Sequence, residues 1–299
     1  MPPDQARFEC RSGSLPYDLP VPAHLKVLRV NHINQIVDDY DGALLHLRDL
    51  FGGQFLREIG ANPVTAGCLV DVGGEIVELL APKVMDRAEG KQLTRYGPHY
   101  QGVEIMVPSV PEALEVMKER GIRTLLERGV DFYTMPSSTQ GVCLQVYDGD
   151  WHADVPPAPY VNPKRAGQWW EREHPIGFRG LHHLSFACTD VQEAERFWCE
   201  LTGGEVTYRA ERPAVAATGV GLDIGIPVEL IAATGPGAID RYVDRYGPRI
   251  WATTFSVREL GATAAYFAAR GVELVPGDAP GTLMVPPERN LHVVYQFME

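Results

Sequence analysis

Apolar and polar positions alternate along the chain in an order that repeats. After a short strand-like block around His32, apolar residues recur at helical spacing from Leu44 to Phe51, and Gly52 follows them as a helix end. Three apolar runs then follow, FLREI, GCLVDV and EIVELL, with glycines near their ends, as is typical of strands. The same order of strand, helix and three strands begins again at GVEIMV. This half of the chain is therefore predicted to form two βαβββ modules.

Polar residues at the predicted helix starts support these modules. Asp38 or Asp39 can cap the first helix, because a short carboxylate accepts hydrogen bonds from free backbone N–H groups. Ser109 and Glu112 have the spacing of a capping box for a second helix that ends near Arg120.

The second half of the chain repeats the first at a nearly constant offset. VNHINQIVDDYDGALLHLRDLFGGQF aligns with LHHLSFACTDVQEAERFWCELTGGEV, and both halves carry an Arg-Tyr-Gly-Pro block. The shared polar positions are His32 and His183, Glu78 and Glu229, and Gln145 and Gln296. One register kept over several blocks indicates a duplicated domain with four modules in total.

The repeat divides the chain into an extended N-terminal arm (1–25), a first domain (26–150), a linker (151–178) and a second domain (179–299). Strands that are mostly antiparallel, with helices on one face, make the predicted fold class α+β. The pair Trp169 and Trp170 is expected to pack the linker onto a domain, with ligand stacking as the alternative.

Composition narrows the function classes. The 299 residues carry a formal net charge of −12, whereas a nucleic-acid surface needs a basic stripe. The sequence has no apolar run long enough for a membrane span and no apolar secretory core, so we expect a cytoplasmic protein. Its five cysteines form no CxxC pair, which fits reduced thiols.

The repeated polar positions are candidate metal ligands. Imidazole and carboxylate bind divalent metals, and the amide oxygen of glutamine serves hard cations. A single histidine or glutamate in a strand is more often structural. We therefore predict one set of three ligands in each domain. The first set is His32, Glu78 and Gln145, and the second is His183, Glu229 and Gln296.

The opening motifs NHI and HHL, the closing VELL and VELI, and MPSSTQGVCLQV together resemble the vicinal oxygen chelate superfamily. This superfamily includes glyoxalase I, bleomycin-resistance proteins, extradiol dioxygenases and methylmalonyl-CoA epimerase, and the final loop resembles the epimerase branch most. The resemblance covers the chain from about Val30 to the end, apart from the linker. It implies two tandem glyoxalase-like domains, each a curved mixed sheet around a cleft, and a divalent ion such as Zn, Mn, Co, Ni or Fe.

The chain departs from the family pattern at two positions. Gln145 and Gln296 replace the last-strand glutamate, and an amide cannot accept a proton at neutral pH. Gly102 and Ala252 are expected at the fifth-strand ligand position, where neither could bind metal. The remaining candidates for proton transfer are His99, Tyr100, His292 and Glu211, with His292 predicted on the face of the last strand that carries Gln296.

These features leave several functions open. The favoured one is a metal-dependent isomerase or lyase that acts on a small oxygen-rich substrate through an enolate-like or oxyanion intermediate. The alternatives are a metal-free binding protein of the bleomycin-resistance type, a chain in which only one copy is active, and an extradiol-type dioxygenase. No nucleic-acid or membrane partner is expected, and the pairing of two copies in one chain leaves a homodimer open.

Overall fold

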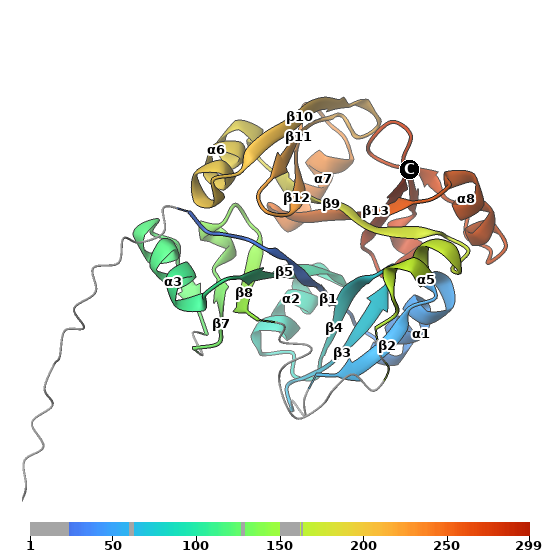
Figure 1. Cartoon of the computed structure of the whole chain (residues 1–299), viewed down its shortest axis with the longest axis horizontal. Helices are drawn as coiled ribbons and strands as arrows, with labels where there is room; N and C mark the ends of the chain where they lie inside the picture. Colours follow the sequence, from blue (N-terminus) through green and yellow to red (C-terminus); the bar gives the residue numbers. More distant parts are fainter. Residues whose placement is uncertain (1–23, 60–62, 127–128, 150–161, 163) are drawn as a thin grey trace, which may run out of the picture.

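The computed structural model describes residues 24–59, 63–126, 129–149, 162 and 164–299. Figure 1 shows two sheets, one from each half of the chain, stacked with helices at both ends. The predicted N-terminal arm up to residue 23, and residues 151–161 and 163 of the predicted linker, lie outside the described residues.

Each half of the chain forms an eight-stranded mixed sheet with the same strand order. The first runs β2-β3-β4-β1-β5-β8-β7-β6, and the second runs β10-β11-β12-β9-β13-β16-β15-β14. The strands of the first sheet are β1 (Arg29–Ile36), β2 (Gln54–Glu58), β3 (Thr65–Val72), β4 (Glu75–Pro82), β5 (His99–Val107), β6 (Thr124–Leu125), β7 (Asp131–Thr134) and β8 (Cys143–Asp148). Those of the second are β9 (Phe178–Cys188), β10 (Glu205–Arg212), β11 (Ala217–Asp223), β12 (Pro227–Ala233), β13 (Arg249–Val257), β14 (Val275–Pro276), β15 (Leu283–Val285) and β16 (Val294–Met298).

One helix follows the first strand of each module, and further helices lie between the modules. The described α-helices are α1 (Tyr40–Phe51), α2 (Ala88–Tyr96), α3 (Val110–Glu119), α5 (Gly167–Arg172), α6 (Val191–Thr202), α7 (Ala238–Tyr246) and α8 (Leu260–Ala268). Short 3-10 turns lie at η1 (Pro136–Ser138), η2 (Pro213–Val215) and η3 (Pro287–Arg289). Among the described residues, no helix is long and apolar enough to cross a membrane.

The helix boundaries follow from capping residues. The side chain of Asp39, and not that of Asp38, accepts the Gly42 N–H at the start of α1, and Gly52 ends the helix in the left-handed conformation. Ser109 accepts the Glu112 N–H in the same way at α3. The helices α2 and α7 were not predicted, because their sequences are mostly polar and each buries a single residue.

The order βαβββ occurs four times, which confirms the α+β fold of paired modules. Within each sheet the first strands of the two modules pair antiparallel, β1 with β5 and β9 with β13. The last strand of each module pairs parallel to its first strand, as β4 does with β1 and β8 with β5. Three of the four central strands of each sheet therefore carry the positions that were predicted to bind metal.

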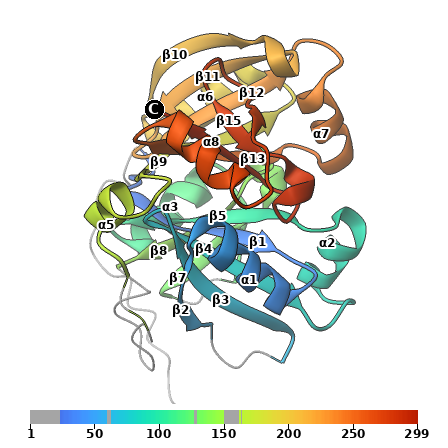
Figure 2. The ribbon, with the colours of Figure 1, turned by 90° about the vertical axis from the view of Figure 1, so that its right-hand side faces the viewer.

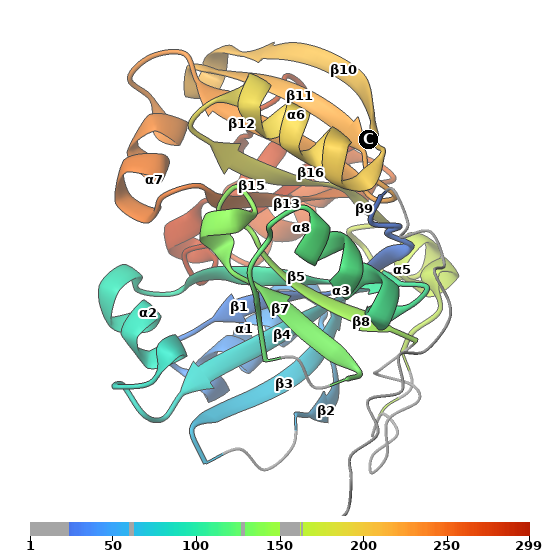
Figure 3. The ribbon, with the colours of Figure 1, turned by 90° about the vertical axis from the view of Figure 1, so that its left-hand side faces the viewer.

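The two domains share one hydrophobic core. Figure 2 shows α1 and α8 on the same side of the molecule, and Figure 3 shows α3 and α6 on the opposite side. Phe51 of α1 packs edge-on against Phe267 and Tyr295 of the second domain. Trp170 of α5 is fully buried and donates to Asp71 of β3, as expected for a linker anchor. Shared burial of large aromatic side chains holds the domains in a fixed arrangement.

Candidate metal site

The central strands of the first sheet bring His32, Glu78 and Gln145 together. His32 on β1 lies opposite Glu104 on β5, Glu104 lies beside Gln145 on β8, and Asn34 lies beside Glu78 on β4. Paired residues in a sheet point to the same face. These polar side chains therefore share one face, while the alternate positions on the same strands face the apolar core.

The imidazole of His32 lies between two carboxylates. Its Nε2 is 3.2 Å from Glu78 Oε2, and its Nδ1 is 3.5 Å from Glu104 Oε1. Complete burial alone would lower the pKa of His32, but Glu104 and Glu78 outweigh this effect and raise it to about 9. Burial also raises the pKa of Glu104, against the opposing charge of His32.

Asn34 connects the two oxygen donors. Its Nδ2 donates to Glu78 Oε2 at 2.6 Å and to Gln145 Oε1 at 3.5 Å, so both oxygens lie around one point. The side chain of His32 is 0% exposed, whereas that of Glu78 is 9% exposed. The Nε2 side of His32 therefore faces the more accessible end of the site, and Glu104 closes the Nδ1 side.

The donor chemistry of this cluster fits a divalent metal. Two ligands of one metal, each about 2.0–2.2 Å from it, lie about 3.0–3.4 Å apart, which matches the separation of His32 Nε2 and Glu78 Oε2. Metal-binding histidines commonly donate their other N–H to a carboxylate, and Glu104 occupies that position. No group of three or more His, Cys, Asp or Glu converges on one point in the described ranges, so a third donor would have to be an amide such as Gln145.

The second sheet places the equivalent residues in a different environment. His183 Nε2 lies 3.4 Å from Glu229 Oε2, much as in the first domain. However, the guanidinium of Arg212, at the end of β10, donates to Glu229 Oε1 in a buried ion pair. Thr254 stands opposite His183, where the first domain has Glu104, and its Oγ1 lies 3.3 Å from His183 Nε2. The charge of the Glu229 carboxylate is therefore already compensated by Arg212.

Gln296 is held by a loop instead of facing an open donor set. Its Nε2 donates to Asp278 Oδ2 at 2.7 Å, and its Oε1 accepts the Asp278 N–H at 2.9 Å. Trp251 Nε1 donates to the same carboxylate. Both ends of the Gln296 amide are thus occupied, which leaves its oxygen poorly placed for a metal.

The candidates for proton transfer lie away from the first-domain cluster. Tyr100 donates to the Val294 carbonyl and contacts Thr253, so it joins the two domains. His99 Nδ1 donates to Gly97 O and its ring packs against Tyr96; burial lowers the pKa of His99 to about 4. Glu211 is exposed on β10.

The expected strand position of His292 is wrong. β16 begins at Val294, and His292 lies in the preceding turn with a left-handed backbone, φ 59°. Strand alternation therefore does not carry its side chain to the face of Gln296.

Gly102 and Ala252, expected at the fifth-strand ligand position, lie opposite Asn34 and Ser185. Glu104 and Thr254, not Gly102 and Ala252, lie opposite the two histidines. Glu104 was missed although a charged residue within the apolar run GVEIMV is an unusual feature. Arg212 was missed because it lies on β10, which carries none of the predicted ligands, and because it has no counterpart in the aligned repeat blocks.

Comparisons with known proteins place this fold in a family. Residues 182–283 match the model of the Glyoxalase/Bleomycin resistance protein/Dioxygenase superfamily. Two solved structures share the fold over nearly the whole chain. A triple mutant of 4-hydroxymandelate synthase from Streptomyces coelicolor has a TM-score of 0.71 and 12% identity, over 91% of this chain and 92% of that one. The 2,3-dioxygenase LapB from Pseudomonas sp. KL28 has a TM-score of 0.56 and 15% identity, over 92% of this chain and 93% of that one.

The family match thus lies within the second domain, and the whole chain has a two-domain fold of the vicinal oxygen chelate type, as the two solved structures do. Among curated proteins, no significant sequence match was found.

Proposed function

We propose that the first domain is a divalent-metal site in a lyase or isomerase that acts on a small oxygen-rich substrate. The ligands would be His32 Nε2, Glu78 and Gln145 Oε1, with Glu104 fixing the imidazole from behind. The observation that carries the proposal is this convergence of three donors on a buried sheet face, with one carboxylate on each side of the imidazole.

When bound, the metal would act as a Lewis acid on a substrate oxygen. Glu78 is the residue best suited to move a proton: His32 and Asn34 both contact its Oε2, which leaves Oε1 to accept a proton from the substrate. Gln145 can orient a ligand but cannot serve as a base. Glu104 holds the Nδ1 side of the imidazole, and Asn31 holds Glu104 in turn by donating to its Oε1 at 3.0 Å.

The residue set favours this chemistry over an oxygenase. Nonhaem iron oxygenases use two histidines and one carboxylate on one face of the metal. The first domain has one histidine in its cluster, with Glu104 opposite it, and the second has one histidine, with Thr254 opposite it. We infer that the second copy has a structural role, because Arg212 supplies the positive charge next to Glu229.

Exchange of substrate protons with solvent tests the proposal. The full chain, stripped with chelator and reloaded with Zn, Mn, Co, Ni or Fe, is incubated in D₂O with a panel of 2-oxo acids, hydroxyketones and acyl thioesters. We expect ¹H NMR to show loss of the proton next to a carbonyl in at least one compound, only with metal, and at least about a hundredfold more slowly in Glu78→Gln.

The exposed Glu211→Gln is the matched control and should exchange at the wild-type rate. If compounds bind the stripped protein but show no proton exchange with any of the metals, the result would contradict the proposed enzyme activity and favour a metal-free binding protein.

A further inference from the structure

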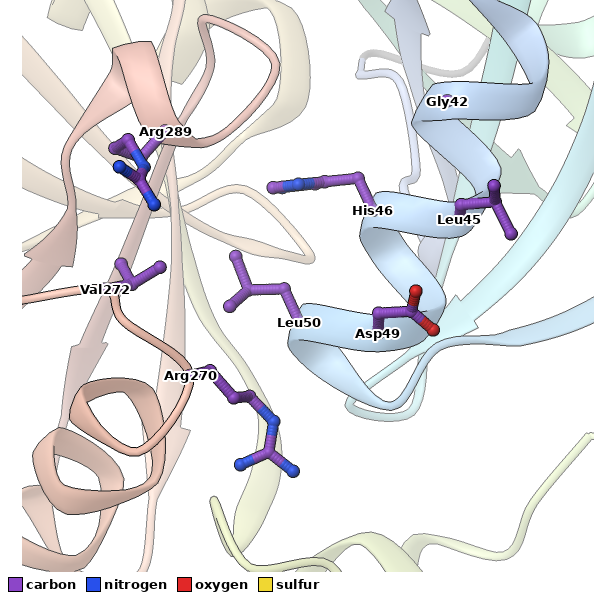
Figure 4. Close-up of a pocket in the computed structure, with 8 residues that line it drawn as sticks. All are labelled: Gly42, Leu45, His46, Asp49, Leu50, Arg270, Val272 and Arg289. Atoms are coloured by element: carbon purple, nitrogen blue, oxygen red, sulfur yellow. The ribbon is translucent and has the colours of Figure 1, made fainter.

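A second candidate site lies between the domains, at the outer side of α1. A cavity of about 460 Å³ is lined by α1 residues of the first domain and by the segments that follow α8 and form η3 in the second. Figure 4 shows His46 and Leu50 projecting from α1 toward Arg289 and Val272. None of the residues of the proposed metal site lines this cavity.

Two arginines of the second domain give the cavity its charge. Arg270 lies over the Tyr266 ring, 3.5 Å from its centroid, and donates to the Tyr266 carbonyl at 3.1 Å. Arg289 donates to the Gly271 carbonyl at 3.4 Å. In the part of the chain that the structure describes, neither guanidinium has a carboxylate partner. Both are therefore positioned by contacts that leave their positive charge uncompensated.

The acidic residue of the cavity does not offset this charge. Asp49 is held by Arg48, whose Nε and Nη2 donate to its two oxygens at 2.6 and 3.1 Å. Burial lowers the pKa of His46, and the nearby Arg289 lowers it further, against the opposing effect of a bond to Asn290. A locally cationic cavity is unusual in a chain with a formal net charge of −12.

Apolar side chains come from both sides of the cavity. Leu45, Leu50 and Val272 line the cavity beside the arginines. His46 Nε2 lies 3.0 Å from Asn290 Oδ1, which ties α1 to the end of η3 across the domain boundary. The cavity therefore combines fixed guanidinium donors with an apolar surface, the two features that an organic anion needs.

We propose that this interdomain cavity binds an organic anion, a phosphate or carboxylate attached to an apolar group. Guanidinium groups bind both anions through paired N–H donors, and the leucines contact the apolar group. Because its walls come from both domains, a bound anion stabilises their contact. The site is independent of the proposed metal chemistry.

Titration of the chelator-treated full chain tests the proposal, with calorimetry and thermal unfolding as readouts. The probes are phenyl phosphate, benzoate, inorganic phosphate and the uncharged benzyl alcohol. We expect saturable binding and a raised midpoint of unfolding for phenyl phosphate, benzoate or both, which identifies the anion. Inorganic phosphate and benzyl alcohol should bind at least about tenfold more weakly, since each lacks one of the two contacts.

The double variant Arg270→Gln, Arg289→Gln should lose at least about tenfold in affinity. Its matched control is Arg196→Gln, Arg241→Gln, which removes the same charge at exposed positions on α6 and α7 and should bind as the wild type does. Equal binding by the two double variants, or no saturable binding of either aromatic anion, would overturn the site. Equal affinity for inorganic and phenyl phosphate would overturn the apolar half of the proposal.

Discussion

In the first domain His32 lies between the carboxylates of Glu78 and Glu104, whereas in the second domain Glu229 lies between His183 and the guanidinium of Arg212. The two sets share residue types and strand positions. They differ in their neighbours: the first concentrates negative charge around an imidazole, and the second contains its own cation. A carboxylate cluster attracts a metal ion, while a buried arginine repels one. The difference teaches that a repeated motif defines a metal site only together with the side chains around it.

The largest expected effect comes from removing the carboxylate that pairs with the buried arginine. Glu229→Ala leaves the Arg212 charge buried without its partner and should cost about 3–5 kcal/mol in the free energy of unfolding. Glu78→Ala should cost only about 1–2 kcal/mol, because His32 can lose its proton. Denaturant unfolding of the metal-free variants measures both, and equal losses would remove the contrast between the domains.

Alkaline pH should weaken the metal-free protein through His32. The pKa of this group is raised to about 9 in the folded chain from 6.5, so the folded state binds more proton between these values. Its contribution is fully present below about pH 6.5 and is lost as the pH rises through 9, by at most about 3 kcal/mol.

Unfolding curves recorded with chelator at pH 6.5 and pH 9.5 test this linkage. His32→Gln should lose much less stability over the same interval than the wild type. A wild type and variant with the same pH dependence would show that His32 is not held as a cation between the two carboxylates.

A smaller effect is expected from the carboxylate behind the imidazole. Glu104→Gln keeps the size of the side chain but removes the charge that faces His32 Nδ1, and should weaken metal binding by about 10- to 100-fold. Competition with a chromophoric chelator measures the affinity. Thr254→Val, at the equivalent position of the second domain, should leave the metal affinity unchanged. A lower affinity in this variant would indicate that the second domain, and not the first, binds the metal.

Much of the fold could be predicted because local rules determine it. Helical spacing and the caps at Asp39 and Ser109 define helices, and the repeat register relates His32 to His183. The neighbours of these residues could not be predicted in the same way. The pairing of β1 with β5 contains irregularities between Val30 and His32 and between Asn34 and Gln35, so the sequence alone does not show that Glu104 lies opposite His32.

The other differences also arise from tertiary structure. The left-handed backbone at Leu291 and His292 ends the η3 turn and delays the last strand, which removes His292 from the expected face. Arg212 reaches Glu229 from the end of an edge strand two positions away in the sheet. Neither the backbone conformation at His292 nor the ion pair of Arg212 with Glu229 has a signal in the sequence, because each depends on how separate segments pack together.

The central claim is that the first domain alone binds metal, and metal stoichiometry tests it most directly. Wild type, His32→Ala and His183→Ala are purified without chelator, reloaded with each candidate ion, desalted, and analysed by plasma mass spectrometry. We predict one equivalent per chain for the wild type and His183→Ala, and none for His32→Ala. A wild type that retains no ion, or a loss of metal in His183→Ala with retention in His32→Ala, would contradict the claim.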